Sequence, residues 1–143
     1  MGLIAARQRS CGPVLVVSAG TAMTVDALAA DGVFIGGLIV PGARLMRQAL
    51  LQGTARVAEA PGHWQAFPRT TADAVQSGIV AALCGAIQQQ HARLAEVSSI
   101  APHCLLTGGD AEMLLPYLTV LAEHVPTLVL EGIDRVTRES MSG

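Results

Sequence analysis

The turn at residues 18–22 carries the groups best suited to hold a phosphate. It reads Ser-Ala-Gly-Thr-Ala and follows the apolar run Val14–Val17. A tight turn that contains glycine exposes backbone N–H groups, and the Thr21 hydroxyl can donate a hydrogen bond to a phosphate oxygen. The same turn could also be a hairpin corner that needs no ligand. On this motif alone, both interpretations stay open.

A second motif, Thr107-Gly108-Gly109-Asp110, follows the apolar residues Leu105 and Leu106. Bare glycine backbone lets a flat base or a ribose lie against it, and a helix that begins there favours negative charge. A structural strand-to-helix turn would explain the motif equally well. Asp110 is better placed as a helix N-cap than as a catalytic group.

Two further motifs follow, and the first of them offers shape rather than acid–base chemistry. The stretch at 36–42 reads Gly-Gly-Leu-Ile-Val-Pro-Gly and has no titratable side chain. The stretch at 69–78 begins with Arg-Thr-Thr, and a hydroxyl at a helix start can cap that helix or bind a substrate.

The composition excludes several classes of protein. The 143 residues carry a net charge of −2, and the nine basic side chains are scattered arginines, so we expect no nucleic-acid partner. Three cysteines and four histidines share no metal-ligand spacing (Cys11, Cys84, Cys104, His63, His91, His103, His124). No apolar stretch approaches the roughly 20 residues that cross a bilayer. We expect a soluble cytoplasmic protein without a membrane partner.

Periodicity and turn residues predict the order β-β-β-α-α-β-α-β. The first three strands form an antiparallel meander, and the later strands alternate with helices. This order predicts an α/β fold, a single ribonuclease-H-like domain with a mixed five-stranded sheet and helices on both faces. Sugar kinases, acetate kinases and actin contain two such units. The predicted strands are 14–17, 22–28, 33–40, 104–107 and 127–130, and the predicted helices are 43–51, 71–97 and 111–122, with shorter helical pieces at 2–9 and from 132.

The four motifs, taken in order, resemble the type III pantothenate kinase family, which is also described as the Bvg accessory factor family. That family reads Asp-x-Gly-Thr-Ala-x-Thr-x-Asp, Gly-Gly-x-Ile-x-Pro-Gly, Asn-Thr leading into Ser-Gly, and Thr-Gly-Gly-Asp-Ala. The resemblance runs from about Ile4 to Leu130. It implies that residues 1–143 are the C-terminal ribonuclease-H-like domain of a two-domain kinase, with the N-terminal domain absent. The Gly-x-Asp-Arg segment that carries the family's catalytic base is then absent too, so we expect no catalytic residue in this chain.

The resemblance also implies an activity. The family phosphorylates pantothenate to 4′-phosphopantothenate with ATP, the first step of coenzyme A biosynthesis, and works as a homodimer that needs K⁺ or NH₄⁺. Gly20, Thr21 and Ala22 match its ATP-phosphate turn. Gly108 and Gly109 match its adenosine-side loop, and Thr71 matches its pantothenate-contacting threonine. The 71–97 helix would lie near the homodimer interface.

One difference between this sequence and the family's motif counts against a cation site. Ser18 stands where the family has its potassium-site aspartate. A neutral hydroxyl can ligate a cation but supplies no charge, which counts against binding of K⁺ or NH₄⁺. Asp26 is the carboxylate nearest the turn and could serve a metal such as Mg²⁺ if it faces the cleft rather than solvent. We expect the chain to be inactive by itself. The alternative is a non-catalytic accessory, transcription-regulatory or dimerisation module.

Overall fold

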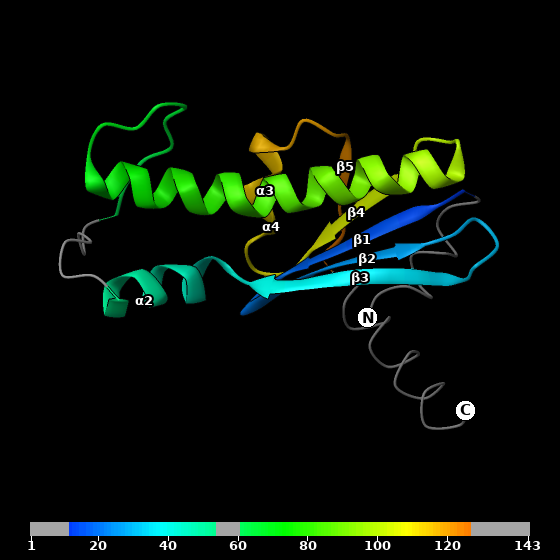
Figure 1. Cartoon of the computed structure of the whole chain (residues 1–143), viewed down its shortest axis with the longest axis horizontal. Coiled ribbons are helices and arrows are strands. Elements are labelled where there is room, and N and C mark those ends of the chain that lie inside the picture. The colour runs from blue at the N-terminus through cyan, green and yellow to red at the C-terminus, as the bar shows by residue number, and fades with distance from the viewer. Residues whose placement is uncertain (1–11, 54–60, 127–143) are drawn as a thin grey trace, which may run out of the picture.

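A computed structural model describes residues 12–53 and 61–126 (Figure 1). Its strands are β1 (Val14–Ala19), β2 (Ala22–Leu28), β3 (Phe34–Pro41), β4 (His103–Thr107) and β5 (Ala122–His124). Its helices are α2 (Ala43–Gly53), α3 (Thr71–Ser98), α4 (Ala111–Leu114) and the 3₁₀ helix η1 (Leu115–Tyr117). The helical pieces predicted at 2–9 and from 132, and the strand predicted at 127–130, lie outside the described residues.

The five strands form one mixed sheet in the order β3-β2-β1-β4-β5. β2 pairs antiparallel with both β1 and β3, whereas β4 runs parallel to β1 and β5 runs parallel to β4. The predicted meander and the mixed five-stranded α/β sheet are therefore confirmed. Figure 1 shows α3 lying along one face of this sheet, with α2 beyond the end of β3. A helix on the second face stays a prediction for the residues outside the described ranges.

Helix α3 forms because its first turn is capped and one of its sides is apolar. The Thr70 side chain accepts a hydrogen bond from the Asp73 N–H at 3.2 Å, and Asp73 places negative charge in the first turn. The helix ends at Ser99, which takes a left-handed conformation. The side chains predicted to recur every four residues are buried, as Val75, Ile79, Leu83 and Ile87. This side rests on the sheet.

The central strand β1 is buried on both faces, as its continuous apolar run predicts. Leu15, Val17 and Ala19 belong to the main core beneath α3, whereas Val14 and Val16 belong to a smaller cluster on the opposite face. Cys84 and Cys104 are buried in the main core, where loss of water raises the pKa of their thiols to about 11 and about 12. They act as small apolar side chains at neutral pH.

Three glycines shape the turn and the strand pairing of the meander. Gly32 takes a φ of 92° in the turn between β2 and β3, and its N–H donates to the Ala29 carbonyl at 2.9 Å. The β2–β3 register shifts between Ala27 and Leu28, opposite Gly36, as at a β-bulge. A side chain at Gly37 would overlap the Asp26 carboxylate. Glycine at this position therefore lets the Asp26 carboxylate lie close to the backbone of β3.

The helix predicted over 111–122 is wrong beyond its first turn. α4 ends at Leu114, and η1 follows with Pro116 in its first turn. Proline has no N–H to donate and its ring clashes with the carbonyl four residues earlier, so an α-helix cannot continue through it. The chain then turns into β5 at Ala122–His124. The fifth strand of the sheet thus begins earlier than the predicted one.

Within the described ranges, no helix has the length and apolar character needed to span a membrane.

Candidate nucleotide-phosphate site

Three glycine turns meet at one end of the sheet. The register pairs Ser18 with Thr107 and Ala22 with Pro41, so the ends of β1, β3 and β4 and the start of β2 lie together. Gly20 follows β1, Gly42 follows β3, and Gly108 follows β4. Motifs that are nearly 90 residues apart in the sequence (20 and 108) thereby form one surface.

Backbone hydrogen bonds tie these turns together. The Gly20 N–H donates to the Ala22 carbonyl at 3.1 Å, and the Gly42 N–H donates to the Thr21 carbonyl at 2.9 Å. From the other side, the Asp110 N–H donates to the Ala19 carbonyl at 2.9 Å. The turn that carries Thr21 is therefore fixed by both neighbouring motifs, and Thr21 itself is exposed.

Two of the glycines are required by how closely the turns approach. A Cβ at Gly42 would overlap the Gly20 carbonyl oxygen and lie 2.7 Å from the Thr21 carbonyl oxygen. Gly108 takes a φ of 100°, and a Cβ there would lie 2.5 Å from the Ala19 carbonyl oxygen. Gly109 differs, because a Cβ there would meet no atom within 4 Å. Gly109 is thus the glycine with open space beside it.

A row of hydroxyl side chains crosses three strands just behind these turns. Ser18 pairs with Thr24 on β2 and with Thr107 on β4, and their apolar neighbours in sequence, such as Val17 and Leu106, point into the core under α3. Side chains alternate along a strand, so the three hydroxyls share the face opposite α3. Sequence reasoning missed this row because it exists only once the strand register is known.

Thr107 is the unusual member of the row. The residue is 1% exposed, and its Oγ1 has no hydrogen-bond partner among residues 12–53 and 61–126. A buried hydroxyl without a partner costs free energy, so such a group in a native fold needs a reason.

Replacing Thr107 with valine should remove this cost. We expect Thr107→Val to leave the free energy of unfolding unchanged or to raise it by about 1 kcal/mol, because valine keeps the β-branched shape without the unpaired hydroxyl. Urea denaturation of the two proteins without ligand measures the difference. Thr24→Val, on the half-buried neighbour, is the matched control. A clear loss of stability on Thr107→Val alone would show that the hydroxyl has a partner.

Asp26 lies on the same face of the sheet as Thr24. It pairs with Val16 on β1 and with Gly37 on β3, and its carboxylate covers Gly37. It is half-buried and has interactions of its own. The described ranges contain no group of three or more histidine, cysteine or acidic side chains that could hold a metal ion.

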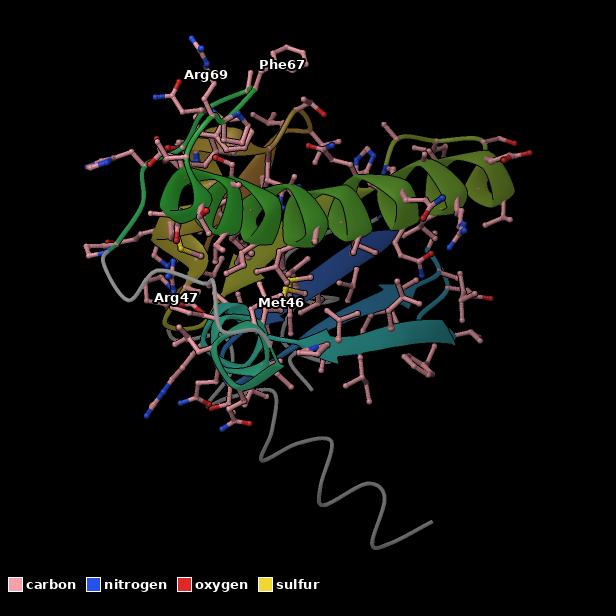
Figure 2. The ribbon with its side chains drawn as sticks, turned by 60° about the vertical axis from the view of Figure 1, so that its left-hand side comes forward. Met46, Arg47, Phe67 and Arg69 are labelled. Atoms are coloured by element: carbon pink, nitrogen blue, oxygen red, sulfur yellow. The ribbon has the colours of Figure 1, made fainter. Side chains whose placement is uncertain are left out.

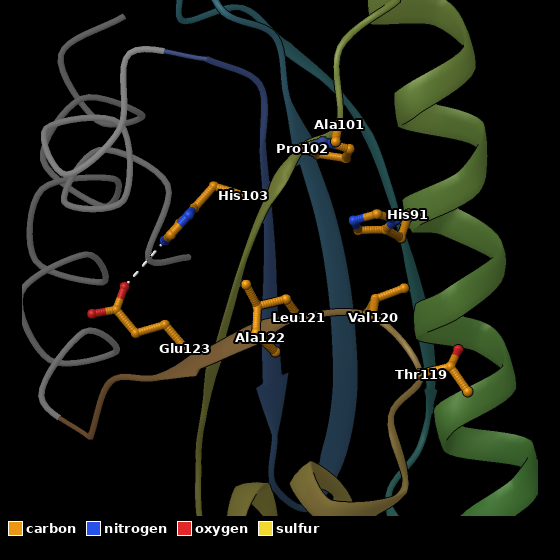
Figure 3. Close-up of a pocket in the computed structure, with 9 residues that line it drawn as sticks. All are labelled: His91, Ala101, Pro102, His103, Thr119, Val120, Leu121, Ala122 and Glu123. Carbon is orange, nitrogen blue, oxygen red and sulfur yellow. Dashed lines mark hydrogen bonds and ion pairs between the residues drawn. The ribbon is translucent and has the colours of Figure 1, made fainter.

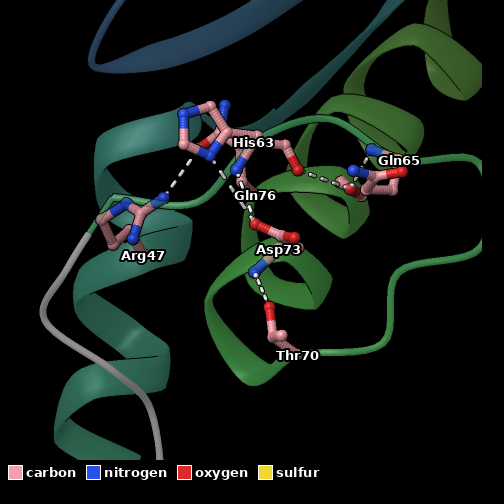
Figure 4. Close-up of polar contacts among 7 residues, drawn as sticks. Arg47, His63, Gln65, Thr70, Asp73 and Gln76 are labelled. Carbon is pink, nitrogen blue, oxygen red and sulfur yellow. Dashed lines mark hydrogen bonds and ion pairs between the residues drawn. The ribbon is translucent and has the colours of Figure 1, made fainter.

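The two threonines at the start of α3, Thr70 and Thr71, have different roles. Thr70 caps the helix, whereas Thr71 is its first residue and is exposed. The neighbouring 61–70 loop is fastened to α3, because the His63 N–H donates to Asp73 Oδ1 at 2.8 Å and the Gln65 N–H donates to Ser77 Oγ at 2.9 Å (Figure 4). Thr71 therefore starts a helix whose first turn is fixed.

The sequence favours solvated surface charge for Arg47 and a capping side chain for Asp110, and the structure differs on both points. Arg47 of α2 is half-buried, and its Nη2 donates to the Gln76 side chain of α3 at 2.7 Å (Figures 2 and 4). It joins the two helices rather than standing in solvent, and no local pattern indicates a partner 29 residues away. Asp110 occupies the N-cap position of α4, but its side chain makes no capping hydrogen bond.

The fold and this site define the class of protein. It is a mixed α/β domain whose glycine turns converge at one end of the sheet. The family model for type III pantothenate kinase matches residues 1–93. The chain belongs to the type III pantothenate kinase family.

Individual relatives agree with this membership. The chain is 67% identical over its full length to a type III pantothenate kinase from Thiobacillus denitrificans, of which it covers 59%. It is 47% identical over 137 residues to one from Chromobacterium violaceum, covering 95% of this chain and 58% of that relative. The chain thus spans about three fifths of the length of these relatives.

A solved structure supports the fold. A conserved Baf family protein from Campylobacter jejuni, named as a transcriptional activator, superposes with a TM-score of 0.65 at 23% identity. The match covers 99% of this chain and 65% of that one.

Proposed function

We propose that this chain supplies the ATP-phosphate side of a pantothenate kinase that forms 4′-phosphopantothenate from ATP and pantothenate in the cytoplasm. The observation that carries the proposal is the meeting of the Gly20, Gly42 and Gly108 turns at one end of the sheet. Membership of the family supports the reaction class.

The turns would hold ATP through backbone and hydroxyl groups. Phosphoryl transfer depends on positioning the phosphates and on neutralising their charge. Thr21 is exposed at the fixed turn and can donate to a phosphate oxygen, while Gly108 and Gly109 leave bare backbone for the adenosine side. No residue of this chain is assigned as the catalytic base, so we infer that the chain alone does not catalyse the phosphorylation of pantothenate.

A monovalent cation fits the hydroxyl row better than Mg²⁺ does. Ser18, Thr24 and Thr107 offer three neutral oxygens, and the Thr107 hydroxyl, which has no partner within the described part of the chain, could act as a ligand. Mg²⁺ prefers carboxylates and phosphate oxygens, which would come from ATP. Bound K⁺ or NH₄⁺ would supply positive charge beside the phosphates. Because the row lacks a carboxylate, we expect this cation to be weakly held.

Pantothenate and a second subunit complete the proposal. Thr71, exposed at the start of α3, is the proposed pantothenate contact. The exposed residues in the first half of α3 are small, so a second copy could approach its backbone closely and form a homodimer. Apart from Thr71, these residues are Ala74, Gly78, Ala81 and Ala82.

ATP binding tests the nucleotide site. We expect ATP to raise the melting temperature of the chain, and Thr21→Ala to weaken ATP binding by about 10-fold through loss of one hydrogen bond to a charged phosphate. Titration calorimetry measures the affinity. Thr119→Ala, another exposed threonine, is the matched control. Equal affinities of Thr21→Ala and the unaltered chain would contradict the assignment of the turn.

The second candidate function is a non-catalytic accessory or dimerisation module. Ser18 favours it, because a neutral side chain at the cation site suits a copy that has lost activity. This alternative predicts no ATP-dependent rise in melting temperature.

A further inference from the structure

The Gln76 side chain bonds to two other helices at once. It is half-buried in the second turn of α3, five residues after Thr71. Its Oε1 accepts a hydrogen bond from Arg47 Nη2 of α2 at 2.7 Å (Figure 4), and its Nε2 donates to Met113 Sδ of α4 at 3.8 Å. Arginine has only donors, so the amide oxygen must face Arg47 and the NH₂ group is left for Met113.

The first of these helices, α2, begins directly after the Gly42 turn. The Met46 N–H donates to the Gly42 carbonyl at 3.0 Å, and the Gly42 N–H donates to the Thr21 carbonyl at 2.9 Å. A shift of α2 would therefore move the backbone that holds Thr21. All 11 residues of α2 are at least partly exposed, so the helix has little buried surface of its own to fix it. The charge-assisted hydrogen bond from Arg47 to Gln76 anchors α2 to α3.

The second helix, α4, follows the turn at Gly108 and Gly109. It has only 4 residues, and a helix of one turn depends on its neighbours for stability. The Asp110 N–H, just before it, donates to the Ala19 carbonyl at 2.9 Å. The contact between Met113 and Gln76 joins α4 to the same point of α3. A thioether sulfur is a weak acceptor, so this contact contributes less than the one to Arg47.

Helix α3 is the most firmly held of the three helices. It has 28 residues, eight of them buried, and the Thr70 side chain caps its first turn. It also presents Thr71, about 7.5 Å from Gln76 along the axis at about 1.5 Å per residue. Gln76 therefore joins a long, well-packed helix to two short helices that begin at the glycine turns.

We propose that Gln76 is a positioning residue for the nucleotide site. Through Arg47 it holds α2 and the contact between Gly42 and Thr21, and through Met113 it holds the turn before α4. Because Thr71 begins the same helix, Gln76 also fixes the proposed pantothenate contact relative to the ATP turns. The inference rests on the proposed function and assigns a role to a side chain outside the glycine turns.

Titration calorimetry with ATP tests this role, at a temperature where melting curves show each variant to be folded. Gln76→Leu keeps the approximate size of the side chain but makes neither hydrogen bond. We expect it to weaken ATP binding roughly 10-fold, because small displacements of positioning groups are costly.

Gln88→Leu is the matched control. The Gln88 side chain also joins α3 to a later segment, because it accepts from the Thr119 N–H at 2.8 Å. This contact lies about 18 Å farther along α3 than Gln76. Figure 3 shows Thr119 beside α3, in the wall of a pocket that His91 and Pro102 also line. We expect Gln88→Leu to leave the ATP affinity unchanged.

A double-mutant cycle separates positioning from stability. We expect Thr21→Ala to weaken ATP binding about 10-fold in the unaltered chain but less than about 3-fold in the Gln76→Leu background, because a displaced hydroxyl contributes less to binding. If Gln76 served stability alone, Gln76→Leu would lower the melting temperature, and Thr21→Ala would have the same effect in both backgrounds. That result would contradict the inference.

Arg47→Met tests whether Arg47 acts through Gln76 or through its own charge. We expect it to weaken ATP binding as much as Gln76→Leu does, with no further loss when the two are combined. A loss in Arg47→Met alone, or equal losses in Gln76→Leu and Gln88→Leu, would overturn the inference while the proposed function stands. An unaltered chain that binds no ATP would overturn the proposed function and the inference with it, so the two failures are distinguishable.

Discussion

Gly108→Ala is expected to lower the free energy of unfolding by about 2–5 kcal/mol. The positive φ of 100° costs a residue with a side chain about 1–2 kcal/mol. The added Cβ would also lie 2.5 Å from the Ala19 carbonyl oxygen, and relieving such an overlap costs a further 1–3 kcal/mol or so. Urea denaturation measures the loss.

The adjacent Gly109 provides the control for this prediction. It has no positive φ, and a Cβ there would meet no atom within 4 Å. We expect Gly109→Ala to change stability by no more than about 0.5 kcal/mol, as surface substitutions usually do. Equal losses for the two variants would mean that the turn after β4 does not press against β1 as described.

Gly42→Ala is expected to affect both stability and ATP binding. A Cβ there would overlap the Gly20 carbonyl oxygen and crowd the Thr21 carbonyl oxygen, so the turn must move. We expect a loss of about 1–3 kcal/mol in unfolding free energy. We also expect an ATP affinity at least about 10-fold weaker, because small displacements of positioning groups are costly. Denaturation and titration calorimetry measure the two effects.

Gly53→Ala is the control for Gly42→Ala. Gly53 is the last residue of α2, and a Cβ there would meet no atom within 4 Å. We expect it to leave ATP affinity unchanged. If Gly42→Ala also bound ATP normally, the contact between the β3 end and the Gly20–Thr21 turn would have no part in holding the nucleotide.

Local signals in the sequence were sufficient for much of the fold. The apolar run at 14–17 predicted a strand buried on both faces, and the four-residue spacing from Val75 predicted the buried side of α3. Both patterns can be recognised within a single segment, because the apolar residues that become buried lie close together in the sequence. The helix predicted over 111–122 is wrong after Leu114, because the helical spacing of apolar residues continues past Pro116. The missing N–H of this proline ends the helix.

The site was predicted only in part, because its contacts join distant segments. The glycine motifs were recognisable one by one, but the hydrogen bonds from Gly42 to Thr21 and from Asp110 to Ala19 depend on the strand order. The alignment of Ser18 with Thr107 likewise follows from the β1–β4 register. No residue pattern encodes that register directly.

The central claim is that this chain provides the ATP-phosphate half of a pantothenate kinase. The Thiobacillus denitrificans relative is 67% identical over the whole chain, which covers 59% of it. The remaining part of that relative, joined to residues 1–143, therefore forms a testable chimera. Assayed with ATP, pantothenate and K⁺ or NH₄⁺, the chimera should produce 4′-phosphopantothenate, whereas the chain alone should produce none. A folded chimera that forms no phosphorylated product would contradict the account.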